Sequence, residues 1–171
     1  MILTDRIPCC VAEDTRIRMG DGSEIPVNEI HPGHKIDGAD GQSATVVDVI
    51  SGREEQMVVI QAQGRNQIRV TAEHPLMTEK GWKTAGELTV EERILMGDGT
   101  YIPVQEYWLK AGGVMVYNLV LEGADAFVAN GYVVGDFKQQ MACERTKGRN
   151  VRQEPDPEIL AEFEKLIKEV R

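Results

Sequence analysis

The first residues along the chain that could do chemistry are two adjacent cysteines. Cys9 and Cys10 directly precede a segment of alternating apolar and polar residues, and a thiolate at this place could attack a carbonyl carbon. A disulfide between neighbouring cysteines would be strained, so we expect free thiols. The alternative is a core role, which is the commoner one for a single cysteine. Cys143 lies in a polar segment.

Three histidines could bind metal or transfer protons. His31 and His34, in His-Pro-Gly-His, could suggest zinc together with the cysteines, but the spacing matches no standard ligand set, so we expect no metal. His74 follows Thr71 by three residues and precedes a proline, at the end of an expected strand. A neutral imidazole in a cleft can donate a proton to a leaving nitrogen. The alternative for His74 is a residue that only caps the strand end.

The elements that must position these residues include a repeat. Arg16–Glu29 and Arg93–Glu106 are identical at ten of fourteen positions, and each places Asp-Gly between two alternating segments. This pattern predicts β-hairpins with type I′ turns. The proline after each turn removes a hydrogen-bond donor, so its strand should start or edge a sheet.

A weaker repeat relates Val58–Thr71 to Tyr117–Asn130 through their apolar pattern and central glycine. Either the domain is duplicated, or any two hairpins look this similar. We favour duplication, which predicts a pseudo-symmetric all-β body with any site in the cleft between its halves. One helical turn is predicted at Thr84–Leu88.

Composition and charge narrow the classes of partner. The chain has 171 residues and a formal net charge of −9, which disfavours nucleic acid and anionic membranes as partners. No apolar run is long enough to span a membrane, and Met1–Pro8 carries charges where a signal peptide needs an apolar core. Three cysteines form no disulfide scaffold. We therefore expect a reduced, cytoplasmic protein, or part of a longer host protein.

Four segments follow one another along the chain. Residues 1–9 form a leader, 10–136 the β domain, 137–155 a polar linker and 156–171 an amphipathic helix. The helix begins at Asp156 as N-cap, followed by proline, and carries one apolar stripe. A helix this short is marginal alone in water, so it should dock on the β body or, alternatively, on a partner protein.

Three motifs, in this order, resemble those of Hint domains, which occur in inteins, bacterial intein-like proteins and hedgehog autoprocessing domains. The first, C-V-A-E-D-T-R-I, begins at Cys10. The second, V-T-A-E-H-P-L-M-T, contains Thr71 and His74. The third is V-Y-N-L-V-L-E-G-A-D-A-F-V-A-N-G-Y-V-V. The resemblance covers residues 10–136 and implies the Hint horseshoe of duplicated hairpins, here without an endonuclease insert.

The resemblance also implies a mechanism. Cys10 would attack the carbonyl of Cys9 and convert the peptide bond into a thioester by an N-to-S acyl shift. His74 would protonate the leaving nitrogen, and Thr71 would position or supply donors for the oxyanion. The domain would then be a single-turnover, self-cleaving domain acting on its own N-terminal segment, with no cofactor and no metal.

The C-terminal junction departs from the splicing pattern. Splicing inteins end in His-Asn followed by Cys, Ser or Thr, whereas this chain has Gly135-Asp136 followed by Phe137. A carboxylate lacks the amide nitrogen that cyclises, so we expect splicing to be lost. Asn118 stands where the family often has Asp, and Asp125 where it often has His. Both remain candidate site residues, together with Asp136.

Two alternatives to self-cleavage stay open. One is an inactive Hint scaffold that serves as a binding module through its C-terminal helix. The other is acyl transfer to a small nucleophile, as in hedgehog-type domains.

Overall fold

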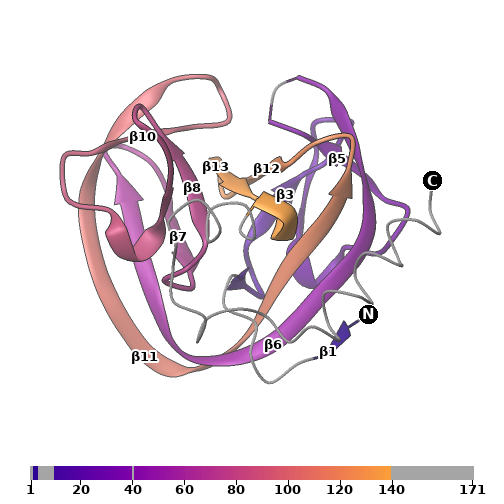
Figure 1. Ribbon diagram of the computed structural model, residues 1–171, viewed down its shortest axis with the longest axis horizontal. Coiled ribbons are helices and arrows are strands. Elements are labelled where there is room, and N and C mark those ends of the chain that lie inside the picture. The colour runs from indigo at the N-terminus through magenta and orange to yellow at the C-terminus, as the bar shows by residue number, and fades with distance from the viewer. Residues whose placement is uncertain (1, 4–9, 40, 140–171) are drawn as a thin grey trace.

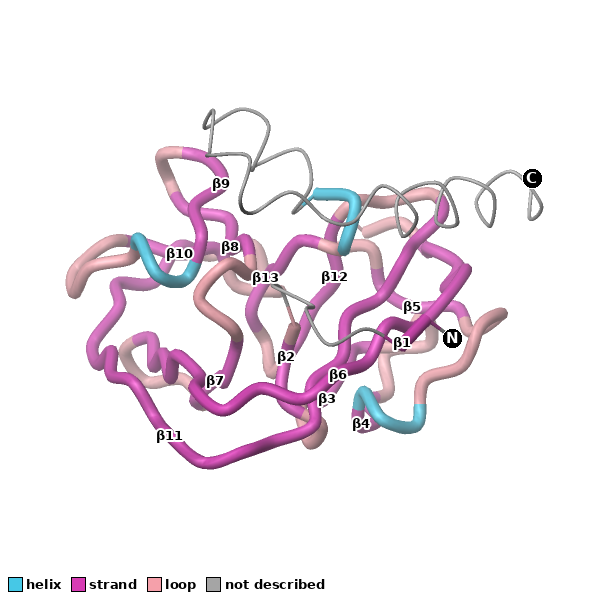
Figure 2. The backbone as a smooth tube through the Cα atoms, turned by 60° about the horizontal axis from the view of Figure 1, so that its bottom comes forward, coloured by secondary structure: helices cyan, strands magenta, loops and turns pink. Residues whose placement is uncertain are grey.

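The chain folds mainly as antiparallel β-strands. The computed structural model describes residues 2–3, 10–39 and 41–139. Within these ranges thirteen strands join one sheet. Figure 2 shows that strands dominate the described chain and that its helical segments are single short turns. The prediction of an all-β body is confirmed.

The strands, in chain order, are β1 (Ile2–Leu3), β2 (Val11–Ala12), β3 (Arg16–Arg18), β4 (Glu24–Pro26), β5 (Lys35–Asp37), β6 (Ser43–Ala62), β7 (Gln67–Val70), β8 (Pro75–Thr78), β9 (Gly81–Thr84), β10 (Arg93–Leu95), β11 (Tyr101–Glu122), β12 (Ala126–Ala129) and β13 (Tyr132–Gly135). The helical segments are the 3-10 turns η1 (Val27–Glu29) and η2 (Ala85–Glu87), and a helical start at residues 137–139. The turn η2 confirms the helical turn predicted at Thr84–Leu88.

The two long strands, β6 and β11, form the frame of the molecule. They pair antiparallel along most of their lengths, and Figure 1 shows them crossing the bottom of the molecule together and rising on both sides. Three register shifts interrupt the pairing, and one falls at Gly112 and Gly113. A β-bulge of this kind bends a strand, and the φ of +119° at Gly112 is one that glycine adopts readily. The band therefore curves into the horseshoe.

Most of the shorter strands lie between the arms of this band, and they form the main core together with residues of β6 and β11 (Figure 1). All four residues of β13 are buried, whereas burial alternates along β7, where Ile68 and Val70 are buried while Gln67 is exposed. Alternate residues of a strand point to opposite faces, so this pattern buries one face. The largest fully buried apolar side chains include Ile17, Ile36, Ile60, Ile68, Leu76, Ile94, Leu119 and Phe127.

Both Asp-Gly hairpins form, but the predicted type I′ turn is wrong. β3 pairs with β4, and β10 pairs with the start of β11. Gly22 and Gly99 have φ of +90° and +88°, whereas Asp21 and Asp98 do not have positive φ. Each glycine N–H bonds to the carbonyl three residues earlier at 3.0 Å. Each loop is therefore a type I turn followed by a left-handed glycine.

The fold repeats in a different register from the stronger sequence repeat. The order β3–β4–η1–β5–β6–β7 recurs as β8–β9–η2–β10–β11–β12. Arg16–Glu29 is a hairpin that ends in η1, whereas Arg93–Glu106 ends inside β11. The weaker repeat does follow the fold, because Val58–Thr71 spans the end of β6 and β7 while Tyr117–Asn130 spans the end of β11 and β12.

The β body continues past the predicted boundary at residue 136. Phe137, assigned to the polar linker, is 3 % exposed and packs in an apolar cluster of the body. Lys138 and Gln139 of that linker are described as well, whereas residues 140–155 and the predicted helix at 156–171 lie outside the described residues. Among the described elements, no helix has the length and apolar character needed to cross a membrane.

Candidate functional site

Cys10 and Thr71 face each other across two neighbouring strands. Cys10 directly precedes β2 and Thr71 directly follows β7, and Val11 of β2 pairs with Val70 of β7. The backbone nitrogen of Cys10 donates to Thr71 Oγ1 at 2.8 Å, and the backbone nitrogen of Thr71 donates to the Cys10 carbonyl at 2.9 Å. The threonine hydroxyl therefore contacts the nitrogen of the Cys9–Cys10 peptide bond.

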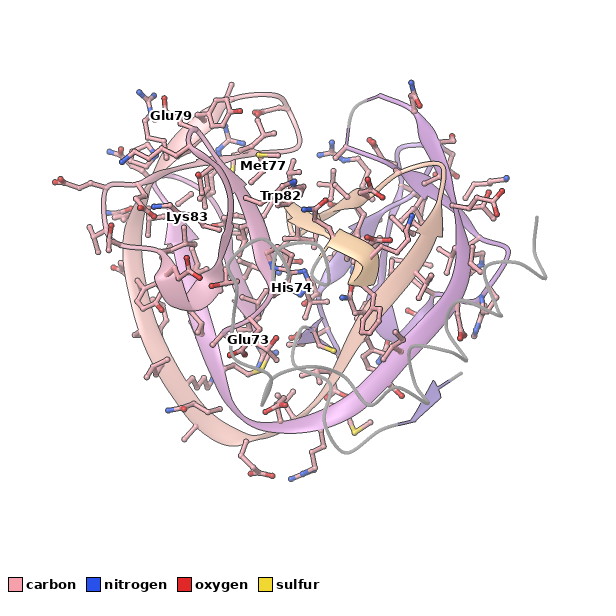
Figure 3. The ribbon with its side chains drawn as sticks, viewed as in Figure 1. Glu73, His74, Met77, Glu79, Trp82 and Lys83 are labelled. Carbon is pink, nitrogen blue, oxygen red and sulfur yellow. The ribbon has the colours of Figure 1, made fainter. Side chains whose placement is uncertain are left out.

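His74 is held next to Thr71 by a tight turn. Its backbone nitrogen donates to the Thr71 carbonyl at 3.0 Å, and its carbonyl accepts from the Ala85 nitrogen at 2.9 Å. The imidazole is fully buried and packs edge-on against Phe127, with ring centroids 6.5 Å apart. Figure 3 shows His74 near the middle of the molecule, above the base of the β6–β11 band. Strand pairing and this turn thus bring Cys10, Thr71 and His74 together.

Burial keeps the imidazole of His74 neutral. It lowers the pKa of His74 to about 3, and the backbone of Gly135 opposes this shift. Gly135 does not reach ordinary hydrogen-bond geometry, and neither ring nitrogen has a hydrogen-bond partner among the described residues. A buried imidazole without partners is costly, and such groups mark functional sites more often than chance would place them there.

The thiol of Cys10 is also neutral at rest. Cys10 is fully buried, and this burial raises the pKa of the thiol well above its ordinary value. The negative charge of Glu54 raises it further, by a smaller amount. The pKa of Glu54 is itself raised by burial and then by the charge of Glu73. Glu73 directly precedes His74 and lies below it in Figure 3. The surroundings of the thiol are therefore acidic and oppose its ionisation, a feature that the sequence pattern did not single out.

Asp136 is fully buried at the other junction of the predicted domain. Its Oδ2 accepts from the Leu121 nitrogen at 3.1 Å, and its Oδ1 accepts from the Gln139 nitrogen at 3.0 Å. The second contact is that of an N-cap to the third residue of a helix. Burial raises the pKa of Asp136 to about 7, although the ammonium group of Lys138 lowers it. Asp136 is therefore tied into the structure through both oxygens.

Asp125 lies beside Asp136 rather than in the Cys10 group. Its carbonyl accepts from the Asp136 nitrogen at 2.9 Å, and its Oδ1 lies 3.2 Å from Lys138 Nζ. Its side chain is 65 % exposed, so this ion pair is largely screened.

Asn118 lies on β11, one residue past the pair of Tyr117 and Val11. Because β11 and β2 run antiparallel, one residue forward on β11 lies opposite one residue back from β2, so Asn118 lies alongside Cys10. Asn118 is fully buried, and its Oδ1 accepts from the Leu119 nitrogen at 2.8 Å. Of the six candidates, Cys10, Thr71 and Asn118 thus lie at the N-terminal junction, and His74 follows Thr71 by one tight turn. Asp125 and Asp136 lie at the C-terminal junction, where Gly135 acts on His74 and Phe137 packs in the apolar cluster that contains Cys10.

Gly135 is a further residue of the site. In the sequence it stands out only because it replaces the histidine of the splicing pattern. A Cβ at this position would lie 2.7 Å from Pro75 Cγ and 2.8 Å from Gln139 Cγ. Real Cβ atoms do not approach carbon so closely, and Pro75 directly follows His74. A histidine at residue 135, as in the splicing pattern, would therefore require Pro75 and Gln139 to shift.

The remaining histidines lie on a turn at the surface. The backbone nitrogen of His31 donates to His34 Nδ1 at 3.0 Å. In the described part of the chain, no three His, Cys, Asp or Glu residues are grouped as metal ligands would be.

Comparison with known proteins identifies the family. The Vint family model, described as a Hint-domain, matches residues 9–106. No protein of the curated set matches the sequence significantly.

Solved structures share the fold. The bacterial intein-like domain from Clostridium thermocellum superposes with a TM-score of 0.68 at 22 % identity, covering 77 % of this chain and 99 % of that one. The DnaB intein from Synechocystis sp. PCC 6803 superposes with a TM-score of 0.68 at 21 % identity, covering 75 % of this chain and 98 % of that one. The Ssp DnaB mini-intein variant M86 superposes with a TM-score of 0.67 at 24 % identity, covering 80 % of this chain and 97 % of that one. Together with the family-model match over residues 9–106, more than half of the chain, this shows that the chain belongs to the Hint-domain family.

Proposed function

We propose that this Hint domain cleaves its own Cys9–Cys10 peptide bond through a thioester on Cys10. The observation that carries the proposal is the hydrogen bond between the nitrogen of that bond and Thr71 Oγ1, next to a buried neutral imidazole. It is a single-turnover reaction whose substrate is the N-terminal flanking segment.

The first step moves the acyl group of Cys9 from nitrogen to sulfur. Cys10 Sγ attacks the carbonyl carbon of Cys9, the carbon–nitrogen bond breaks, and the thiol proton ends on the nitrogen of Cys10. His74 relays the thiol proton to the departing nitrogen; because burial disfavours a free imidazolium, this transfer is concerted with cleavage of the carbon–nitrogen bond. Thr71 holds that nitrogen in place throughout. This role differs from the expected one, in which Thr71 supports the oxyanion.

The second step is attack on the thioester by an outside nucleophile. An amide is more stable than a thioester, so without this step the nitrogen of Cys10 takes the acyl group back. Water would release the leader as a carboxylic acid, and hydroxylamine would release it as a hydroxamate. Cleavage after residue 9 is complete once Cys10 is again a free thiol.

Splicing is lost in this proposal because the C-terminal junction is structural. Asp136 uses both carboxyl oxygens as acceptors for backbone N–H groups, and Phe137 has no nucleophile that could receive an acyl group. A Cβ at residue 135 would meet Pro75 Cγ at 2.7 Å, so the packing here also disfavours an assisting histidine.

The test is intact-mass spectrometry of the full chain incubated with hydroxylamine. The start of the leader pairs with β6 through Ile2 and Leu3, so masses should be read after denaturation, which separates a cleaved leader from the body. We expect fragments 1–9, as the hydroxamate, and 10–171. Cys10→Ala should abolish them, whereas Cys9→Ala, which leaves the attacking thiol in place, should retain them.

A wild-type chain that stays whole, both alone and with a longer N-terminal fusion, would refute the proposal. Cleavage that persists in Cys10→Ala would refute it as well. Release of a fragment beginning at Phe137 would overturn the structural role of the C-terminal junction.

A further inference from the structure

Phe137 and Cys10 belong to one buried apolar cluster that is separate from the main core. Cys10 is fully buried and Phe137 is 3 % exposed. Phe137 is the bulkiest member of this cluster. The other buried members are Ala12, Val47, Ile50, Met57, Val116 and Val120.

The origins of these residues show on which side Phe137 lies. Ala12 belongs to β2 and Cys10 directly precedes that strand. The remaining members, apart from Phe137, come from β6 and β11. β11 pairs with both β2 and β6, so these residues form one patch of sheet. Phe137 follows β13 and, among the described residues, is the cluster's one member from outside that patch. It therefore packs onto this patch from another part of the fold, within the cluster that contains the Cys10 thiol.

The backbone on either side holds Phe137 firmly. The Asp136 side chain is bonded to the nitrogens of Leu121 and Gln139, and the Asp136 nitrogen donates to the Asp125 carbonyl at 2.9 Å. Phe137 is thus the first residue of a capped helical turn, where the cap fixes the direction of the chain. On the other side, Gly135 is wedged against Pro75.

We propose that Phe137 shields the Cys10 acyl group from external nucleophiles. The inference rests on the proposed thioester. The sulfur-bound acyl carbon has two competing fates: attack by the nitrogen of Cys10, which restores the peptide bond, and attack by water or another outside nucleophile, which releases the leader. Phe137 blocks only the second path, because the nitrogen is already inside. The native chain is then a latent domain that cleaves slowly, and Phe137 sets the choice of nucleophile.

The test compares three variants of the full chain with wild type: Phe137→Ala, Phe137→Leu and, as a control that removes apolar bulk away from this cluster, Ile30→Ala. Ile30 is buried in the main core beside η1. Two rates are measured in native buffer: alkylation of Cys10 by iodoacetamide, located by peptide mapping, and leader release in hydroxylamine.

Phe137→Ala should raise both rates about tenfold or more, because the reactivity of a thiol and its ester follows access. Phe137→Leu should give intermediate rates, and Ile30→Ala should leave both near wild type. A folded Phe137→Ala that alkylates Cys10 at the wild-type rate would overturn the shield. If Phe137→Ala does not fold, Phe137→Leu decides in the same way.

The two proposals fail differently. Faster alkylation of Cys10 without leader release in any variant would support the shield on the thiol and refute self-cleavage. Leader release at equal rates in wild type and Phe137→Ala would support self-cleavage and refute the shield.

Discussion

The Thr71 hydroxyl accepts a hydrogen bond at 2.8 Å from the backbone nitrogen of Cys10, although the two residues are 61 positions apart in sequence. This nitrogen must leave the acyl group if the Cys9–Cys10 bond is to break. The Thr71 hydroxyl therefore has two roles: it satisfies a buried backbone N–H group of the fold, and it positions the leaving nitrogen of the proposed reaction.

Replacing Thr71 by valine should affect stability and cleavage together. Valine keeps the shape but removes the acceptor, which leaves the buried Cys10 N–H without this partner and costs about 1–3 kcal/mol of unfolding free energy. Leader release should slow about tenfold or more because the nitrogen is no longer positioned. Urea unfolding and intact mass measure the two effects. Thr71→Ser, which keeps the hydroxyl, is the control; equal cleavage in the valine and serine variants would contradict the positioning role.

His74 should make the protein less stable as the pH falls below neutrality. Its folded pKa of about 3 lies below the ordinary value of 6.5, so between these values the unfolded chain binds a proton that the folded chain does not. The contribution is complete above pH 6.5 and is lost as the pH falls toward 3, amounting to roughly a few kcal/mol. Urea unfolding at a series of pH values measures this slope. His74→Gln, which carries no titrating group, should flatten it; an unchanged slope would show that His74 does not titrate as a buried neutral group.

Asp136 should titrate near neutrality, with the opposite effect on stability. Its folded pKa of about 7 lies above the ordinary value of 3.8, so the folded chain retains the proton that the unfolded chain loses. Its contribution to stability is present below pH 3.8 and is lost as the pH rises through 7. Carboxyl ¹³C NMR should show a midpoint near 7.

The neighbours of Asp136 provide the check on that assignment. Lys138→Gln removes a charge that lowers the pKa of Asp136, so the midpoint should rise. Asp125→Asn removes a charge that raises it, so the midpoint should fall. Shifts in the opposite directions would show that the titrating signal belongs to another carboxyl group.

Gly135→Ala should destabilise the protein and slow cleavage. The new Cβ would lie 2.7 Å from Pro75 Cγ, so the strand or the proline must move. Overpacking of this kind costs about 1–3 kcal/mol, and movement of Pro75 disturbs His74. Gly20→Ala is the matched control: Gly20 does not have positive φ and its nearest neighbour is the Ser43 hydroxyl at 3.3 Å, so the cost should stay within about 0.5 kcal/mol. Thermal unfolding compares the two, and equal melting temperatures would contradict the close packing at Gly135.

Local features of the fold were readable from the sequence. The Asp-Gly pairs between alternating segments located both hairpins, because a turn depends on a few neighbouring residues. The turn type was not predicted correctly, because it depends on which residues have positive φ. Here only the glycine of each Asp-Gly pair does. The stronger sequence repeat also misled about the symmetry: hairpin loops of one kind use similar residues wherever they occur, so likeness between loops does not report the register of the fold.

By itself, the sequence determined the β-type of the body, the resemblance to Hint domains, and Cys10, Thr71 and His74 as residues worth examining. Only the tertiary structure decided that β2 lies between β7 and β11, which places the Cys10 nitrogen on the Thr71 hydroxyl. It also decided that Asp136 is a buried cap and that Phe137 packs in the same apolar cluster as Cys10. The physical reason is that strand pairing joins residues far apart in the chain, and burial follows from that pairing rather than from any short stretch of sequence.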